Sequence, residues 1–326
     1  MNPAVSVIVP IYGVEDFVER CAGSLFAQDF TEDVEFIFVD DASPDKSIGR
    51  LKKVIEEFPN RIPQIHIVCH EENKGLPDAR NTGLGLARGE YILHVDSDDY
   101  VEPTMLSAML AAARKEDADI VCCDWYLDLG YRERRMYEPN VSTPHDAVCE
   151  MLSGGMKFNV WNKLVSRRLY MENDIKFPSG NGMGEDMTMI LLCAHANKVV
   201  HLPEALYHYV KVNAGAFSRT YSDTHLAQLK YNVNRISTYL TEHFDKEYDL
   251  VLPFLQLEAK FPFLLMPDNK YLQLWTEWYP EANRWILKNR HISLRSRIVQ
   301  WCAYRKLWIF VKMYRKLLNR IVYGDK

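Results

Sequence analysis

The chain has 326 residues, 48% of them hydrophobic, and a formal net charge of −5 at pH 7. Its length suits one large domain with an appendage, and its hydrophobic content excludes a globally disordered chain. The negative charge excludes a generally basic nucleic-acid binder.

Short apolar runs alternate with helical patterns over residues 1–125. The strand-like runs are 5–9, 34–39, 65–68, 91–95 and 119–125. Apolar residues at helical spacing predict helices at 14–28, 48–58, 77–88 and 103–115. Strands separated by helices of this length predict parallel pairing, and therefore an α/β nucleotide-binding architecture.

From residue 126 this alternation breaks down, with irregular sequence at 126–160 and one helix near 145–153. A glycine-rich loop at 179–184 leads into a helix that continues to 196. Two strands are expected at 198–202 and 206–211, and the chain from 222 is expected to be mostly helical.

Acidic residues follow the second and the fourth predicted strands, as Asp40-Asp41 and as Asp96-Ser97-Asp98. Ligands of open α/β sheets bind beyond the carboxyl ends of the strands, so both clusters should face one crevice. Closely spaced carboxylates repel unless a cation offsets them, and Mg²⁺ or Mn²⁺ prefers oxygen ligands together with substrate phosphates. The alternative is that these are aspartate-rich turns that cap helices, with Asp45 as one such cap.

Two further segments carry candidate chemistry. Asp186 follows Glu185 at the start of a helix, where a carboxylate could act as general base for a hydroxyl, although simple helix capping is the alternative. Arg80, in the loop-to-helix segment 74–81, suits bidentate phosphate contact, although it could equally be a solvated surface residue. Glycines 83, 85 and 89 do not have the spacing of a dinucleotide fingerprint and precede a strand, so we reject that interpretation.

These motifs resemble, in order and spacing, glycosyltransferase family 2 with the GT-A fold, particularly bacterial members that build surface polysaccharides. The matching segments are 5–12, 38–45, 73–83, 89–92, 95–103, 160–164, 184–186 and 205–209. The resemblance covers residues 3–220 and implies a Rossmann-like mixed sheet flanked by helices. The implied domains are a GT-A domain at 1–220, with a nucleotide-binding half at 1–125 and an acceptor half at 126–220, followed by a mainly helical C-terminal region at 221–326.

The resemblance also implies how the donor is bound. The Pro10 backbone and the Tyr12 ring would contact the base, Asp41 would accept its N–H, and Asp96 would face the ribose. Arg80 is the expected phosphate contact. Because Tyr12 and Asp41 suit uracil, a UDP-sugar is favoured, with dTDP- and GDP-sugars left open.

For the reaction, the resemblance implies that Asp98 holds Mn²⁺ or Mg²⁺ on the diphosphate and that Asp186 deprotonates the acceptor, with inversion at the anomeric centre. His208 is a candidate second metal ligand, with a packed histidine as the alternative. Ala42 stands where glycine is commoner in the family, and we expect this departure to be harmless. The predicted function is therefore inverting sugar transfer to a glycan or lipid-linked hydroxyl, with a sugar-nucleotide nucleotidyltransferase or a non-catalytic nucleotide-sugar binder as the alternatives.

The last segment, 290–326, interleaves cations with aromatic residues, which is typical of a helix lying on an anionic membrane. The alternative is a helix packed on the rest of the protein with its cations in solvent. We found no signal peptide and no apolar run long enough to span a bilayer, so a cytoplasmic protein, peripheral on the inner face of the membrane, is expected. Seven cysteines without a C-x-x-C pair are expected to be buried and reduced.

Overall fold

The computed structural model describes residues 2–30, 34–211 and 222–323, and it contains two compact units. The first unit comprises residues 1–147 and 158–232, and the second comprises 148–157 and 233–326. The domain boundary expected between residues 220 and 221 lies outside the described residues.

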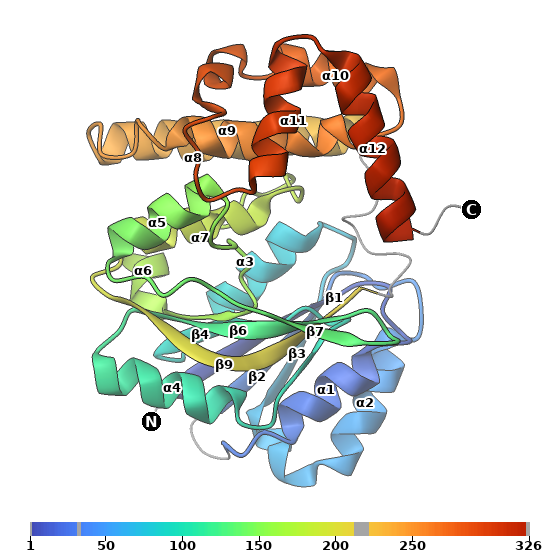
Figure 1. Cartoon of the computed structure of the whole chain (residues 1–326). Helices are drawn as coiled ribbons and strands as arrows, with labels where there is room; N and C mark the ends of the chain where they lie inside the picture. Colours follow the sequence, from blue (N-terminus) through green and yellow to red (C-terminus); the bar gives the residue numbers. More distant parts are fainter. Residues whose placement is uncertain (1, 31–33, 212–221, 324–326) are drawn as a thin grey trace. The chain divides into compact units, whose positions relative to one another are not determined.

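The first unit is built on a mixed sheet, as predicted (Figure 1). The described strands follow the order β3-β2-β1-β4-β8-β6-β9-β5, and β7 pairs with β6. Their bounds are β1 Val5–Ile11, β2 Val34–Asp40, β3 Ile65–Cys69, β4 Tyr91–His94, β5 Tyr100–Val101, β6 Ile120–Asp128, β7 Glu133–Met136, β8 Lys163–Ser166 and β9 Val199–Val210.

Strand β1 is fully buried because helices cover both faces of the sheet, which explains its continuous apolar run. It pairs in parallel with β2 and β4, and β2 pairs in parallel with β3. The carboxyl ends of these four strands therefore lie along one edge. Strand β8 is antiparallel to both β4 and β6 and lies between them, so it separates the four parallel strands from β6, β9 and β5.

Figure 1 shows α1, α2 and α4 on one face of the sheet and α3, α6 and α7 on the other. The bounds are α1 Val18–Phe26, α2 Ser47–Glu57, α3 Leu76–Leu86, α4 Met105–Glu116, α5 Pro144–Ser153, α6 Arg167–Glu172 and α7 Thr188–His195. Helix α3 packs closely on β1, since a Cβ at Gly83 would lie 2.4 Å from Cγ2 of Ile8. Close packing therefore explains this glycine without a role in dinucleotide binding.

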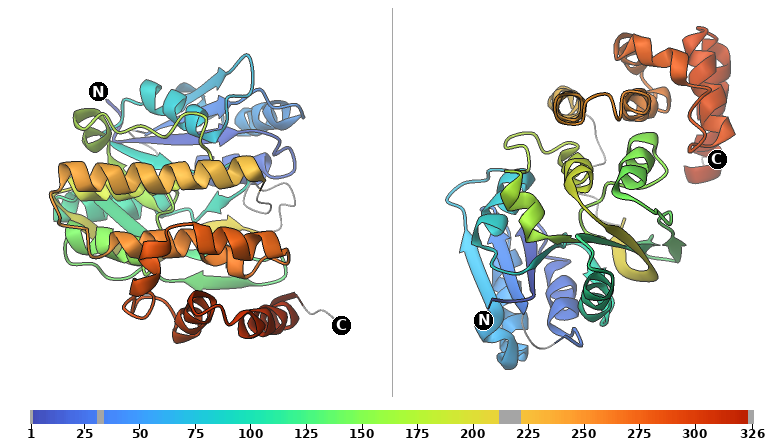
Figure 2. Two further views of the ribbon diagram at one scale, coloured as in Figure 1. Left: turned by 90° about the horizontal axis from the view of Figure 1, so that it is seen from above. Right: turned by 90° about the vertical axis from the view of Figure 1, so that its left-hand side faces the viewer.

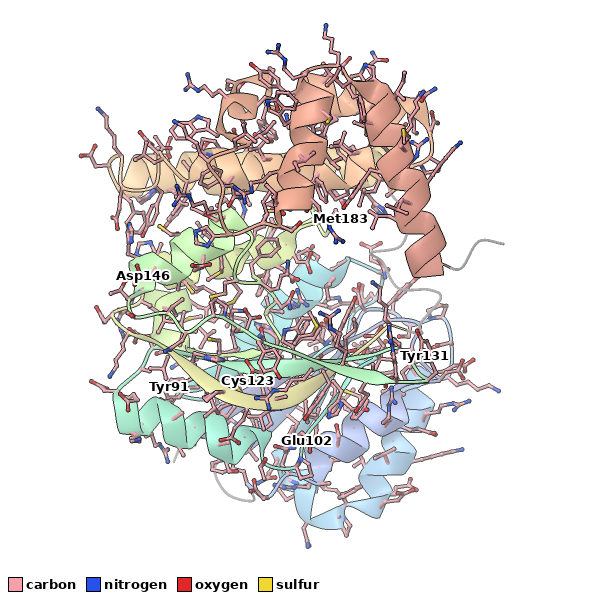
Figure 3. The ribbon with its side chains drawn as sticks, in the orientation of Figure 1. Tyr91, Glu102, Cys123, Tyr131, Asp146 and Met183 are labelled. Atoms are coloured by element: carbon pink, nitrogen blue, oxygen red, sulfur yellow. The ribbon has the colours of Figure 1, made fainter. Side chains whose placement is uncertain are left out.

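Several short elements differ from the sequence prediction. The two strands expected at 198–202 and 206–211 are one strand, β9, whose pairing with β6 has a register irregularity around Asp124. Strands β5, β7 and β8 and helix α6 were missed, because runs of two to six residues give too little periodicity. Five of the seven cysteines are buried, Cys123 of β6 among them (Figure 3), and none of the seven forms a disulfide within the described residues.

The second unit is helical, as predicted. Its described helices include α9 Leu252–Lys260, α10 Asn269–Glu277, α11 Leu294–Tyr304 and α12 Trp308–Tyr323, and α8 Asp223–His243 runs into it from the first unit. Trp275 and Phe263 are almost fully buried in its core. Burial lowers the pKa of Lys260 to about 7, and its ammonium donates to the Trp278 carbonyl at 2.6 Å. Within the described part of the chain, no helix is both long and apolar enough to span a bilayer.

Candidate active site

A buried arginine organises the carboxyl edge of the sheet. Arg80, on α3, is only 1% exposed. Its Nη1 donates to Glu185 at 2.7 Å and to Asp186 at 3.0 Å, and its Nη2 donates to Asp96 at 2.8 Å. One guanidinium thus joins the acidic turn after β4 to the acidic pair that follows about ninety residues later in the chain. The structure brings together three residues that the sequence analysis selected separately.

Helix α3 also holds the loop that precedes this acidic pair. The side chain of Asn81 donates to the Phe177 carbonyl and accepts from the Phe177 N–H, both at 2.9 Å. The Asp78 carboxylate accepts from the Ser179 hydroxyl and from the Gly180 N–H. Segment 74–81 therefore fixes the glycine-rich loop, a role that its sequence did not reveal.

The acidic pair itself is a single turn of 3₁₀ helix, Glu185–Met187, and α7 follows it. Gly184 precedes the turn with a φ of 87°, a backbone conformation that favours glycine. Neither carboxylate makes a side-chain capping bond at these helix ends, and both instead bond to Arg80. The side chain of Asp186 is 27% exposed and that of Glu185 is 8% exposed, so Asp186 is the more accessible of the two.

The acidic turn after β4 is supported from β9. Tyr207 donates its hydroxyl proton to Asp99 at 2.7 Å, and its oxygen accepts the Asp96 N–H at 3.1 Å. The Tyr207 ring stacks on Trp161 at 4.3 Å between centroids. Asp99 is fully buried and also accepts the Val210 N–H, so it is a structural member of the cluster. Asp98 lies between Asp96 and Asp99, which these bonds hold in place, and it is partly exposed.

The charges in this cluster perturb one another. Burial raises the pKa of Asp96 to about 6; the Arg80 guanidinium opposes this rise and the carboxylates of Asp98 and Asp186 add to it. Burial, together with the neighbouring Asp186 charge, raises the pKa of Glu185 well above its ordinary value. The site therefore holds more carboxylates than one guanidinium can neutralise, an electrostatic setting that favours an additional cation.

This excess of acid fits the predicted divalent metal. Asp98 is partly exposed, and hard cations prefer such carboxylate oxygens. Among the residues the structure describes, no group of three or more His, Cys, Asp or Glu side chains could hold a metal by itself. Because Mg²⁺ typically takes only one or two protein carboxylates together with substrate phosphates and water, metal binding at Asp98 stays a prediction.

The residues predicted to meet the base lie at the ends of β1 and β2. Pro10 is in register with Val39, and the Asp41 N–H bonds to the Ile11 carbonyl at 2.9 Å, which fixes the two strand ends together. The Tyr12 ring that follows is 52% exposed and available for stacking.

Asp41 is 3% exposed and already well bonded. Its carboxylate accepts the N–H groups of Lys74 and Gly75, both at 2.8 Å, and lies 2.7 Å from a ring nitrogen of His70. It therefore fixes the start of segment 74–81, and recognition of a base N–H by this carboxylate stays a prediction.

His208 lies in β9, stacked between the rings of Tyr100 and Tyr126. Its Nδ1 is 2.8 Å from Glu133, and its Nε2 is 2.8 Å from Glu102. Metal binding by His208 would require one of these contacts to be exchanged, and that role also stays a prediction. Arg80 is in a similar position, because both of its terminal nitrogens bond to carboxylates, and a phosphate contact would have to compete with them.

Sequence comparison places these residues in a known family. A profile of Glycosyl transferase family 2 matches residues 6–179. The uncharacterized glycosyltransferase EpsJ of Bacillus subtilis is 32% identical over 264 residues, covering 78% of this chain and 70% of EpsJ. Glycosyltransferase GlyG of Streptococcus pneumoniae is 31% identical over 239 residues, covering 68% of this chain and 75% of GlyG.

Structure comparison gives the same fold. TarS 1-349 of S. aureus, solved in complex with UDP-GlcNAc, aligns with a TM-score of 0.69 at 22% identity and covers 100% of this chain and 93% of its own. This match confirms the predicted GT-A fold and its helical C-terminal part. The family profile and the two relatives show that the chain belongs to glycosyltransferase family 2.

Proposed function

We propose that this glycosyltransferase is metal-dependent and inverting, and that it transfers a hexosyl or N-acetylhexosaminyl group from a UDP-sugar to an acceptor hydroxyl. The acceptor would be a glycan or a lipid-linked sugar in surface-polysaccharide or glycolipid synthesis. The observation that best supports this proposal is the Arg80 bridge, which holds Asp186 beside the acidic turn of Asp96 and Asp98.

Asp186 is the proposed general base. A base must come within about 2.6–3.2 Å of the hydroxyl whose proton it takes, so it needs access to the crevice. Asp186 has this access, whereas Glu185 is buried and bonds to Arg80 at 2.7 Å. Direct displacement of the diphosphate with Asp186 on the opposite face of the sugar inverts the anomeric centre and requires only this one base.

Asp98 would hold the divalent cation, with Asp96 directed at the ribose. When bound, the cation stabilises the negative charge that develops on the leaving diphosphate. Within the protein, Arg80 and Tyr207 both bond to Asp96 at one end of the acidic turn, and Tyr207 also bonds to Asp99 at the other end. Asp98 is therefore presented from a fixed backbone.

The preference for UDP rests on residues of this chain. The exposed Tyr12 ring can stack on a base, and Asp41, if it exchanges one of its present contacts, can accept the base N–H. That the TarS fold was solved with UDP-GlcNAc is consistent with this choice, although at 22% identity the match speaks only for the fold.

A thermal-shift screen with UDP-, dTDP- and GDP-sugars, each with and without Mn²⁺, tests the proposal because a ligand of the folded state raises the melting temperature. We expect the largest shift with a UDP-sugar and Mn²⁺. Asp98→Asn should abolish transfer and make UDP binding insensitive to Mn²⁺. Full activity of this variant, or of the wild type in excess chelator, would exclude the metal-dependent mechanism.

A further inference from the structure

Helix α11 of the second unit exposes a row of large apolar side chains. Leu294, Ile298 and Trp301 are 61%, 49% and 38% exposed, and their spacing of four and three residues places them on one face of the helix. The opposite face, which includes Val299 and Ala303, is buried. The helix is therefore anchored by one face and presents a second apolar face to solvent.

Helix α12 repeats this arrangement. Ile309, Phe310, Met313 and Leu317 are 75%, 59%, 61% and 56% exposed, whereas Val311 is fully buried. At about 100° per residue the four exposed side chains fall within roughly one third of the helix circumference. Helices α11 and α12 contact each other and lie side by side in Figure 1 and in both views of Figure 2.

Positive charge accompanies these apolar faces. Lys312 and Lys316 are exposed, and the helical repeat places them directly beside the row of Ile309 and Met313. Arg305 and Lys306, between the two helices, are also exposed. The sequence from 282 to 324 contains no aspartate or glutamate, so no acidic side chain of this segment offsets the cations.

We propose that α11 and α12 form a lipid-docking surface, defined by the seven exposed apolar residues above, which binds anionic membrane headgroups. Exposed apolar side chains flanked by lysine and arginine are the pattern of an interfacial helix, whose apolar face enters the headgroup boundary while its cations meet phosphates. Two copies of this surface packed together would bring like charges face to face, which disfavours a second copy of the chain as the occupant. The lipid-docking surface contains none of the residues proposed for sugar transfer, so either proposal can be refuted without affecting the other.

The test uses the full-length chain and co-sedimentation with two kinds of vesicle, phosphatidylcholine alone and phosphatidylcholine mixed with phosphatidylglycerol. A triple variant, Ile309→Gln, Phe310→Gln and Met313→Gln, replaces three apolar side chains of α12 with glutamine, which has good helix propensity. A double variant, Lys312→Gln and Lys316→Gln, removes charge only. The matched control is Tyr131→Gln with Tyr137→Gln, two side chains of the first unit that are 79% and 72% exposed; Figure 3 shows Tyr131.

We expect the wild type and the tyrosine control to sediment with the anionic vesicles only. Binding should be lost in ~1 M NaCl, where the Debye length is about 3 Å. The triple and the double variant should each bind the anionic vesicles at least ~10-fold more weakly than the wild type, while their melting temperatures and their UDP-dependent thermal shifts stay unchanged. Equal sedimentation of the triple variant and the wild type would refute the proposal. A wild-type dimer that the triple variant converts to monomer in sedimentation equilibrium would also refute it, because the surface would then be a protein interface.

Discussion

Replacing Arg80 by methionine tests the central contact of the site. Methionine has a similar length but no charge, so the change leaves Glu185 buried without its cation and removes one partner from Asp96 and one from Asp186. Breaking a buried ion pair by removing one partner costs about 3–5 kcal/mol. Because Asp96 and Asp186 are each about one quarter exposed, water compensates for part of their loss, and we assign this cost to Glu185 alone.

For a domain of this size, 1 kcal/mol corresponds to a shift in melting temperature of about 2–4 °C, so Arg80→Met should melt roughly 6–20 °C lower. The assay is thermal and urea unfolding in chelator without nucleotide. Arg50→Met is the control, since the ion pairs of Arg50 within the described residues are long, 3.9 and 3.7 Å, and join it to exposed acids. Exposed pairs of this kind are typically worth less than about 1 kcal/mol.

The pH dependence of Arg80→Met gives a second readout. Without the guanidinium, the pKa values of Asp96 and Glu185, which burial already raises, should rise further. A raised carboxyl pKa destabilises the folded state above that pKa, and the cost is relieved as the pH falls through it. The deficit of the variant should therefore shrink between pH 8 and pH 5. A variant that is within about 1 kcal/mol of the wild type at pH 8 would refute the role we give this arginine.

Three further predictions concern other positions. Asp186→Asn should keep donor binding and reduce turnover by ~10²–10⁴-fold, measured as sugar transfer, whereas a larger loss in Glu185→Gln would reverse our choice of base. Ala42 has a φ of 57°, so Ala42→Gly should stabilise the protein by ~0.5–1 kcal/mol in urea unfolding, and a destabilised variant would contradict this reasoning. Burial lowers the pKa of Lys260 to about 7, so above pH 7 the folded state binds fewer protons than the unfolded state. The free energy of unfolding should therefore rise with pH from about 7 towards 10. Lys260→Met should remove that rise in melting curves followed by tryptophan fluorescence.

The nucleotide-binding half could be predicted from the sequence because its strands, such as β1, are continuous buried runs with helices between them. Strand β8 could not be predicted in this way, because its four residues pair antiparallel with β4 and β6 and nothing in its local sequence specifies partners so distant in the chain. At position 42, alanine in place of the family's commoner glycine was expected to be harmless. The structure shows a left-handed conformation there, which gives a physical reason for the glycine common in the family.

In the candidate site, too, some features could be predicted from the sequence and others could not. Asp96, Asp98 and Asp186 were identifiable as motifs, because acidic residues at strand and loop ends are visible in the sequence. Their connection through Arg80 was not, since it joins positions 105 and 106 residues apart and an arginine in a loop motif has no visible partner. Tyr207 was likewise included only within a family motif, and its support of Asp96 and Asp99 emerges only when β9 is placed in the sheet.

The contacts of α3 constrain how this enzyme can be re-engineered. Asp78, Arg80 and Asn81 each hold a different part of the segment from Phe177 to Asp186. A chimera that imports this segment from a relative to change acceptor choice would separate these contacts unless the recipient helix carries matching residues. The helix and the loop must therefore be exchanged together, although about a hundred residues separate them in the chain. Libraries that vary both segments should yield more folded enzymes than libraries that vary the loop alone.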